Sequence, residues 1–227
     1  MLVKLKTFLE NINFDCTTSL RLYHYANNNP VKYTDPDGSE LTKAEIEKRD
    51  ALFTKLVNMA DKCGWWTAKN TDYQGNGIII GGANLGKKEI QELKSISTRA
   101  CTAGAISLRN EYRNDDIKVN DWAVDLRNGN DISYYKDNKG RVITDPGTLF
   151  DQLQVGDLLI YSNPANPEGI KGKGWTGHTA SIIGKRDDYL ITLEFHENGQ
   201  DPTINKIYKD SLQWFGDTKL EGGASWN

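Results

Sequence analysis

Cys101 is the residue of this sequence best suited to act as a nucleophile. A thiol attacks a carbonyl carbon as the thiolate, so it needs a base that takes its proton and a third group that orients that base. Candidates for both roles follow in the chain: His178 in the stretch Gly177–Gly184, and then Glu194 and His196. A cysteine followed in this order by a histidine and polar partners is typical of a cysteine hydrolase.

The alternation of side chains along a strand shows which candidates for the third group, the one that orients the base, lie together. Residues two apart on a strand point to the same face, so Glu194 and His196 share one face while Phe195 points to the other. We expect Glu194 to orient His178 and His196 to be a second polar partner. Which of the two orients the base stays open at this point.

Helices are expected first along the chain and strands after them. Apolar residues recur at helical spacing from Thr42 to Lys62, with Thr42 as the N-cap and Glu45 three residues later. Gly77–Gly81 is expected to be a buried strand. The remaining expected elements are helices over Lys87–Leu93, Ile96–Asn110 and Asp121–Arg127, a hairpin over Asp131–Arg141, and strands over Val155–Tyr161, Thr179–Ile183, Leu190–Phe195 and Thr203–Tyr208. Helices followed by successive antiparallel strands indicate an α+β fold.

Composition excludes several classes of protein. The chain has 227 residues and a net charge of -3, without the concentrated positive charge of a nucleic-acid binder. No apolar run approaches the ~18 residues of a transmembrane helix, and the first residues lack the pattern of a secretory signal. The cysteines Cys16, Cys63 and Cys101 form neither a disulfide framework nor a zinc-binding spacing, so we expect no metal and no cofactor.

The downstream motifs resemble a known family. Gly156-Asp157-Leu158-Leu159-Ile160-Tyr161 and Gly177-His178-Thr179-Ala180-Ser181-Ile182-Ile183-Gly184 match landmarks of the papain-like amidase fold of NlpC-type and CHAP-type cell-wall hydrolases. The resemblance covers roughly residues 95 to 200. It implies a helix that bears the cysteine, packed on an antiparallel sheet that bears the histidine.

The same resemblance implies roles for single residues. Cys101 would be the nucleophile and His178 the general base, which later protonates the leaving amine. CHAP-type relatives align Glu194 with their orienting acid, whereas NlpC-type relatives favour His196. The backbone amide of Cys101 would stabilise the oxyanion, and the small residues after it would let substrate approach closely. We expect Trp175, Thr102 and Gly177 to line the substrate cleft.

A second resemblance concerns the segment over residues 20–40. Tyr23-His24-Tyr25-Ala26-Asn27-Asn28-Asn29-Pro30, followed by Asp35-Pro36-Asp37-Gly38, resembles the end of the repeat-associated core of Rhs/YD-repeat polymorphic toxins. Residues 1–40 would then be a remnant of that core with its linker, and residues 41–227 the hydrolase domain, helical over about 41–94 and catalytic over about 95–227. Ser39 stands where the family commonly has leucine, which leaves autocleavage open.

Together these resemblances imply a secreted or exported effector that acts in the envelope or interior of a target cell, countered by a cognate immunity protein. The first hypothesis is an amidase or endopeptidase that cuts peptidoglycan peptides. A second is a protease, deamidase or acyltransferase acting on a protein. A third is an inactive carbohydrate-binding module, which would have a Cys101 thiol of ordinary reactivity.

Overall fold

An antiparallel sheet forms the centre of the structure, a computed structural model that describes residues 41–71, 77–114, 117, 126, 130–166, 177–196, 200–215 and 218–227. All of these residues belong to the unit Asp37–Asn227. The expected boundary segment over residues 20–40 lies outside the described residues, as does nearly all of the expected helix Asp121–Arg127.

Nine strands are present in the described part of the chain, and each pair of neighbours is antiparallel. Their order across the sheet is β1-β2-β7-β6-β5-β4-β9-β3, and β8 pairs with β9. Their bounds are β1 Trp65–Thr71, β2 Gly77–Ala83, β3 Ile132–Tyr134, β4 Leu158–Ser162, β5 Gly177–Lys185, β6 Tyr189–Glu194, β7 Thr203–Tyr208, β8 Trp214–Phe215 and β9 Thr218–Trp226. With its helices, this sheet confirms the expected α+β class.

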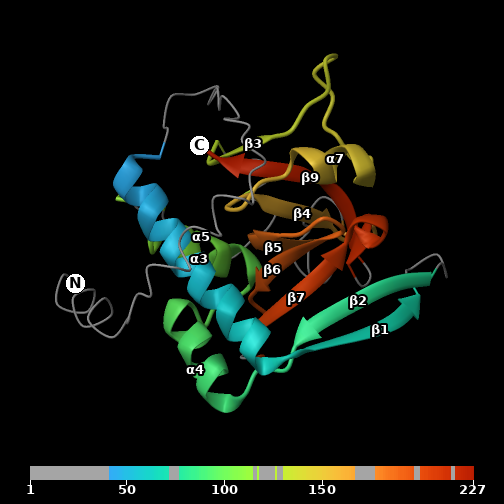
Figure 1. Ribbon diagram of the computed structural model, residues 1–227. Helices are drawn as coiled ribbons and strands as arrows, with labels where there is room; N and C mark the ends of the chain where they lie inside the picture. Colours follow the sequence, from blue (N-terminus) through green and yellow to red (C-terminus); the bar gives the residue numbers. More distant parts are fainter. Residues whose placement is uncertain are drawn as a thin grey trace. The chain divides into compact units, whose positions relative to one another are not determined.

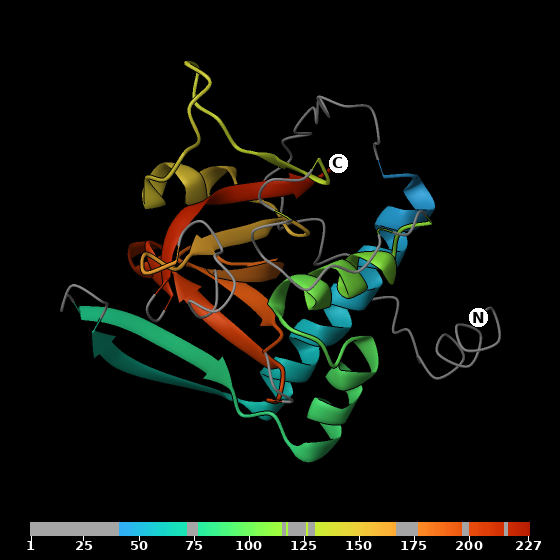
Figure 2. The same cartoon turned by 180° about the vertical axis from the view of Figure 1, so that it is seen from behind.

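Helices cover both faces of the sheet, as Figures 1 and 2 show. The helices are α3 (Lys43–Cys63), α4 (Lys87–Ile96), α5 (Cys101–Asn110) and α7 (Pro146–Gln152). Ile183 and Leu193 point to the face of α3, where they join Phe53 in one apolar core. Ile182 and Leu190 point to the other face and pack in a second core with residues of α7. The central strands are therefore buried on both sides.

The start of α3 is formed as its sequence predicts. The Thr42 hydroxyl accepts a hydrogen bond from the Glu45 backbone amide at 3.3 Å, and a Glu45 carboxylate oxygen accepts one from the Thr42 amide at 2.9 Å. This capping box satisfies two amides that the helix itself leaves without acceptors. The other Glu45 oxygen accepts from the Asn114 amide at 2.7 Å, which ties the chain after α5 to the start of α3.

Two expectations about elements are wrong. The helix expected over Ile96–Asn110 begins at Cys101, because α4 continues to Ile96 and the non-helical residues 97–100 separate the two helices. The strand expected to be buried at Gly77–Gly81 is only partly covered: Ile79 is 39% exposed. The cause is its register, since β2 pairs with β7 only over Ile80–Gly82, and the rest of the β1–β2 hairpin projects beyond the sheet.

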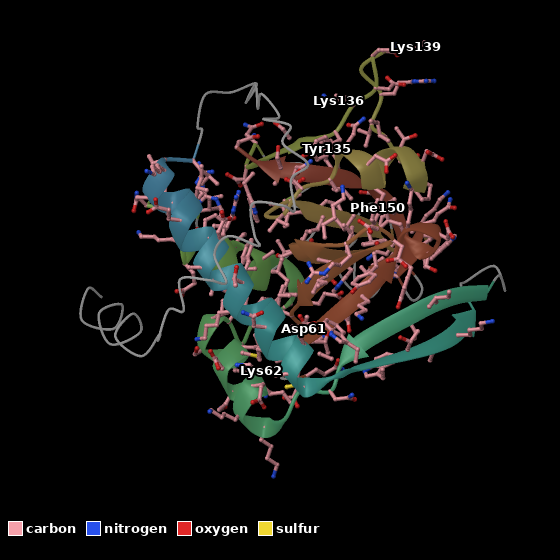
Figure 3. The ribbon with its side chains drawn as sticks, viewed as in Figure 1. Asp61, Lys62, Tyr135, Lys136, Lys139 and Phe150 are labelled. Carbon is pink, nitrogen blue, oxygen red and sulfur yellow. The ribbon has the colours of Figure 1, made fainter. Side chains whose placement is uncertain are left out.

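Sequence patterns also left several elements out. Strands β1, β8 and β9 and helix α7 were not expected, and β1 and β2 lie within the part that was expected to be helical. The expected hairpin Asp131–Arg141 is present in part. Lys136 bridges to Val142 around a tight turn that carries Lys139 away from the sheet, whereas β3 before it pairs with β9 (Figure 3).

We predict that Gly177→Ala destabilises the protein by about 1–3 kcal/mol, the usual cost of an overpacked site. A Cβ atom at Gly177 would lie 2.1 Å from the carbonyl oxygen of Tyr161 on β4, and the backbone there has a φ of +156°. The start of β5 would have to move to relieve this clash. Urea unfolding measures the loss. Gly147→Ala is the control, because its added Cβ would meet no atom closer than 3.6 Å. Equal stability of the two variants would contradict the prediction.

Candidate active site

Cys101 is the first residue of α5. The residue before it, Ala100, is extended (φ -61°, ψ 173°), and the first intrahelical bond runs from the Gly104 amide to the Ala100 carbonyl at 2.7 Å. The amides of Cys101 and the two following residues therefore have no acceptor within the helix, and the thiol lies at its positive end. This end of a helix stabilises a thiolate.

A side chain in the preceding segment explains why the helix begins here. The Ser97 hydroxyl accepts a hydrogen bond from the Arg99 backbone amide at 3.1 Å, and Ser97 itself is extended. Such a local bond offers the backbone an alternative to helix. It separates α4 from α5 and leaves Cys101 at a helix terminus, where a continuous helix from Ile96 would have put it in the second turn.

The small residues after Cys101 pack α5 onto the sheet. A Cβ atom at Gly104 would lie 2.3 Å from the ring of Phe195, so only glycine lets the helix come this close. The Thr102 hydroxyl is 3.3 Å from the Thr179 hydroxyl on β5, and Thr102 is completely buried. These residues were expected to open space for substrate. In the structure the sheet itself occupies this space, because α5 must approach β5 for Cys101 to reach His178.

His178 and Glu194 form a buried pair. The Nε2 atom of His178 is 3.0 Å from a carboxylate oxygen of Glu194, and the two side chains are 5% and 0% exposed. With Nε2 occupied, Nδ1 is the imidazole nitrogen that remains for the Cys101 thiol. The pair comes from neighbouring strands, His178 near the start of β5 and Glu194 at the end of β6.

The second oxygen of Glu194 is also held. It accepts a hydrogen bond from the Thr192 hydroxyl at 2.6 Å, and the carboxylate is hydrogen-bonded by the Asn205 side chain on β7. Asn205 in turn donates to the Thr203 hydroxyl at 3.0 Å. Glu194 is therefore fixed by its own strand and by both neighbouring strands, as the anion that orients an imidazole must be.

The pKa values of the three groups favour an ion pair. Burial raises the pKa of the Cys101 thiol, but the hydrogen bond and charge of His178, with the Thr179 backbone amide, hold that pKa below its ordinary value. Burial lowers the pKa of His178, but its bonds to Cys101 and Glu194 raise it to about 10. Burial likewise raises the pKa of Glu194, and His178 with Thr192 brings it below its ordinary value. These interactions shift the equilibrium from the neutral pair toward a thiolate and an imidazolium.

His196 lies beside the pair without orienting the base. Its Nε2 atom is 2.9 Å from the Thr203 hydroxyl, and its ring is nearly parallel to that of His178 with centroids 6.0 Å apart. Burial lowers the pKa of His196, so its ring is neutral at pH 7. Phe215 stacks on His178 at 4.6 Å. Of the two expected partners, Glu194 is the one that bonds to His178.

The other expected site residues have these positions. Gly177 is buried opposite Ser162 in the β4–β5 ladder, where it allows the close approach to Tyr161. Thr102 lies beneath the thiol, with its hydroxyl 3.9 Å from Sγ. Trp175 lies outside the described residues.

Several residues of the site escaped the sequence analysis. Thr192 could have been found, since it precedes Glu194 by two residues and must share its face of the strand. Asn205 and Phe215 gave no such signal, because they reach the site only through the pairing of β6 with β7 and of β8 with β9.

The arrangement has the parts that acyl transfer requires: a thiol with a lowered pKa at a helix N-terminus, a base hydrogen-bonded to it, and a buried anion that holds the base. Among the described residues no group of three or more His, Cys, Asp or Glu side chains could hold a metal ion. No helix in the described ranges is long and apolar enough to cross a membrane.

Comparisons with models of protein families, with curated proteins and with solved structures found no match for this chain. The chemistry must therefore be derived from the geometry of Cys101, His178 and Glu194.

We predict that iodoacetamide alkylates Cys101 with a pH midpoint below that of an ordinary thiol. His178→Ala should move the midpoint upward, because burial then acts on the thiol without the opposing imidazolium, and each unit of that shift slows the reaction at pH 7 by roughly tenfold. Mass spectrometry of each cysteine measures the rates, with Cys63 as the internal reference. Glu194→Gln should slow the reaction more than His196→Gln. The reverse order would assign the orienting role to His196.

We predict that Thr192→Val raises the pH midpoint of Cys101 and costs about 1–3 kcal/mol of stability, because a buried carboxylate oxygen loses a donor. Thr192→Ser keeps the hydroxyl and should restore both the midpoint and the stability. Alkylation profiles and urea unfolding of the two variants provide the test. A midpoint that stays at the wild-type value in Thr192→Val would show that Thr192 does not support the ion pair.

Proposed function

We propose that this protein is a cysteine-dependent amidase or endopeptidase, with Cys101 as nucleophile, His178 as base and acid, and Glu194 as the orienting group. The observation that carries the proposal is the buried 3.0 Å bond between His178 and Glu194, on an imidazole that interacts with a thiol at a helix N-terminus. Burial of a carboxylate is costly unless strong partners compensate for it. A pair of this kind therefore supports a catalytic role for His178.

The reaction follows from the ion pair. The Cys101 thiolate attacks the carbonyl carbon of an amide, and the electron pair of the C=O bond moves to oxygen. The amides at the start of α5, which have no acceptor within the helix, would donate to this oxyanion. Collapse of the adduct breaks the C–N bond as the His178 imidazolium gives its proton to the leaving amine. Water, deprotonated by the neutral imidazole, then attacks the thioester; the C–S bond breaks, the carboxylic acid product leaves, and the thiolate and imidazolium are regenerated.

A pH dependence follows from the same groups. Protonation of the thiolate removes the nucleophile as the pH falls through the pKa of Cys101, which lies below its ordinary value. Loss of the imidazolium proton removes the general acid as the pH rises through the pKa of His178, at about 10. Cleavage should therefore show a bell-shaped profile, whereas alkylation, which needs only the thiolate, should reach a plateau on the alkaline side.

Peptide bonds of peptidoglycan are the proposed substrate. Support comes from the motifs Gly156–Tyr161 and Gly177–Gly184, which resemble those of NlpC-type and CHAP-type cell-wall hydrolases. The segment over residues 20–40, which resembles the end of an Rhs core, supports a role as the C-terminal effector of such a system. The effector would act in the envelope of a target cell and would have a cognate immunity protein as its partner.

A protein substrate uses the same nucleophile, and one experiment separates the two. Purified peptidoglycan and a lysate of recipient cells are each incubated with wild type, with Cys101→Ala and with Cys63→Ala as a matched control, and the products are identified by mass spectrometry. We predict that wild type and Cys63→Ala release peptides from peptidoglycan and that Cys101→Ala loses this activity by at least about a hundredfold.

The other outcomes are equally informative. Intact peptidoglycan with cleaved, deamidated or acylated lysate proteins would reassign the substrate to a protein. Full activity of Cys101→Ala would refute the proposed nucleophile.

A further inference from the structure

Two buried threonines lie next to the proposed nucleophile. Thr102 follows Cys101 on α5, and Thr179 follows His178 on β5, against which α5 packs (Figure 1). The two threonines are 0% and 1% exposed, so their hydroxyls must find partners within the protein. Their oxygen atoms are 3.3 Å apart, and the Thr102 oxygen is 3.9 Å from the Cys101 Sγ atom. The steps of amide cleavage use neither hydroxyl.

The partners of the two hydroxyls determine the direction of their hydrogen bonds. Each hydroxyl has one proton to donate. Within the described part of the chain, the Thr179 hydroxyl has one partner, the Thr102 oxygen, whereas the Thr102 hydroxyl has two, the Thr179 oxygen and the Cys101 sulfur. If Thr102 donated to Thr179, the Thr179 proton would be buried without an acceptor, which is costly. Thr179 therefore donates to Thr102, and the Thr102 proton is directed to the sulfur.

The backbone of Thr179 provides a second donor to the same sulfur. The Ile182 amide donates to the Asp157 carbonyl, just before β4, at 2.8 Å, so alternation along β5 turns the Thr179 amide toward the side of β6. Strand β6 ends at Glu194, and the Thr179 amide bonds to the Cys101 sulfur. The end of the β5–β6 ladder thus leaves a donor for the thiol.

These donors oppose the effect of burial on the thiol. Burial raises the pKa of Cys101, and the hydrogen bonds of His178, the Thr179 amide and the Thr102 hydroxyl lower it. A donor stabilises a thiolate more than a thiol, because an anion is the stronger acceptor. His178 gives its proton to the leaving amine, whereas the threonines keep theirs. Their donors therefore remain available when the thioester is hydrolysed and the sulfur leaves as an anion.

We propose that Thr179 and Thr102 form a hydroxyl relay that delivers a hydrogen bond to the Cys101 thiolate. Thr102 is the donor in contact with the reacting sulfur. Thr179 is a positioning residue, because its hydroxyl occupies the Thr102 oxygen and so turns the Thr102 proton toward the sulfur. The inference rests on the proposed function and adds these two residues to the support of its nucleophile.

Alkylation of Cys101 by iodoacetamide over a range of pH tests the relay. Thr102→Val should raise the pH midpoint and slow the reaction about threefold or more below it, because the anion loses one hydrogen bond. Above the midpoint this variant should react slightly faster than wild type, since a thiolate of higher pKa is the stronger nucleophile. Thr102→Ser keeps the hydroxyl and should restore the wild-type profile. Ser107→Ala is the control: it removes from α5 a hydroxyl that bonds to the Ala103 carbonyl, and it should leave the profile unchanged.

Urea unfolding separates this electrostatic role from a structural one. Thr102→Val leaves the Thr179 hydroxyl buried without a partner and should lower the urea concentration at the unfolding midpoint. The double variant, Thr102→Val with Thr179→Val, removes both hydroxyls with little change of shape, so it should recover most of the stability. The pH midpoint of Cys101 should nevertheless stay raised. The double variant also provides the test if Thr102→Val alone does not fold.

The outcomes separate the relay from the function on which it rests. A wild-type pH midpoint in the double variant would overturn the relay, as would a shift in Ser107→Ala as large as that in Thr102→Val. The proposed function is judged by the midpoint of the wild type and by the loss of peptide release in Cys101→Ala. An ordinary wild-type midpoint would count against the ion pair, whereas the relay is judged only by the difference between variants and wild type.

Discussion

A carboxylate without any exposure to water is the constraint on which the rest of this structure depends. Glu194 is 0% exposed, and the transfer of such a charge out of water is offset only when donors surround it. Thr192, Asn205 and His178 provide those donors from three adjacent strands. Removal of any one of them would leave part of a buried charge without compensation, so β5, β6 and β7 are held together by electrostatics as well as by their ladders.

The same carboxylate determines the state of the thiol. Glu194 favours the proton on His178, the imidazolium favours the anion on Cys101, and the helix N-terminus favours that anion from the other side. The favoured charges therefore alternate from Glu194 through His178 to Cys101. Two close contacts position these three residues: that of Gly177 with the Tyr161 carbonyl and that of Gly104 with the ring of Phe195.

The elements with regular patterns could be predicted from the sequence. The capping box of α3 and the central strands β5, β6 and β7 have clear periods, and the order of motifs, with the resemblance to cell-wall hydrolases, pointed to Cys101 and His178. Strand β9 was not predicted, although it lies between β4 and β3, because its Gly222–Gly223 segment interrupts the alternation by which a strand is recognised.

One local hydrogen bond and one long-range contact account for the remaining differences. The first residue of α5 depends on one hydrogen bond within the segment before it, and a helical period cannot reveal such a bond. The choice of Glu194 over His196 depends on which side chain faces His178 once β5 and β6 pair. Alternation placed both on one face, and only the three-dimensional contact between the His178 ring and the Glu194 carboxylate separates them.

The distance in sequence between Cys101 and His178 has a consequence for the chain before it folds. No local structure can bring α5 to β5, and until the sheet is complete Cys101 and His178 keep the pKa values of isolated side chains. In a newly synthesised or unfolded chain the Cys101 thiol is therefore no more reactive than that of any free cysteine. The lowered pKa of Cys101 appears only with the finished tertiary structure, so folding itself creates the electrostatic environment of the thiol.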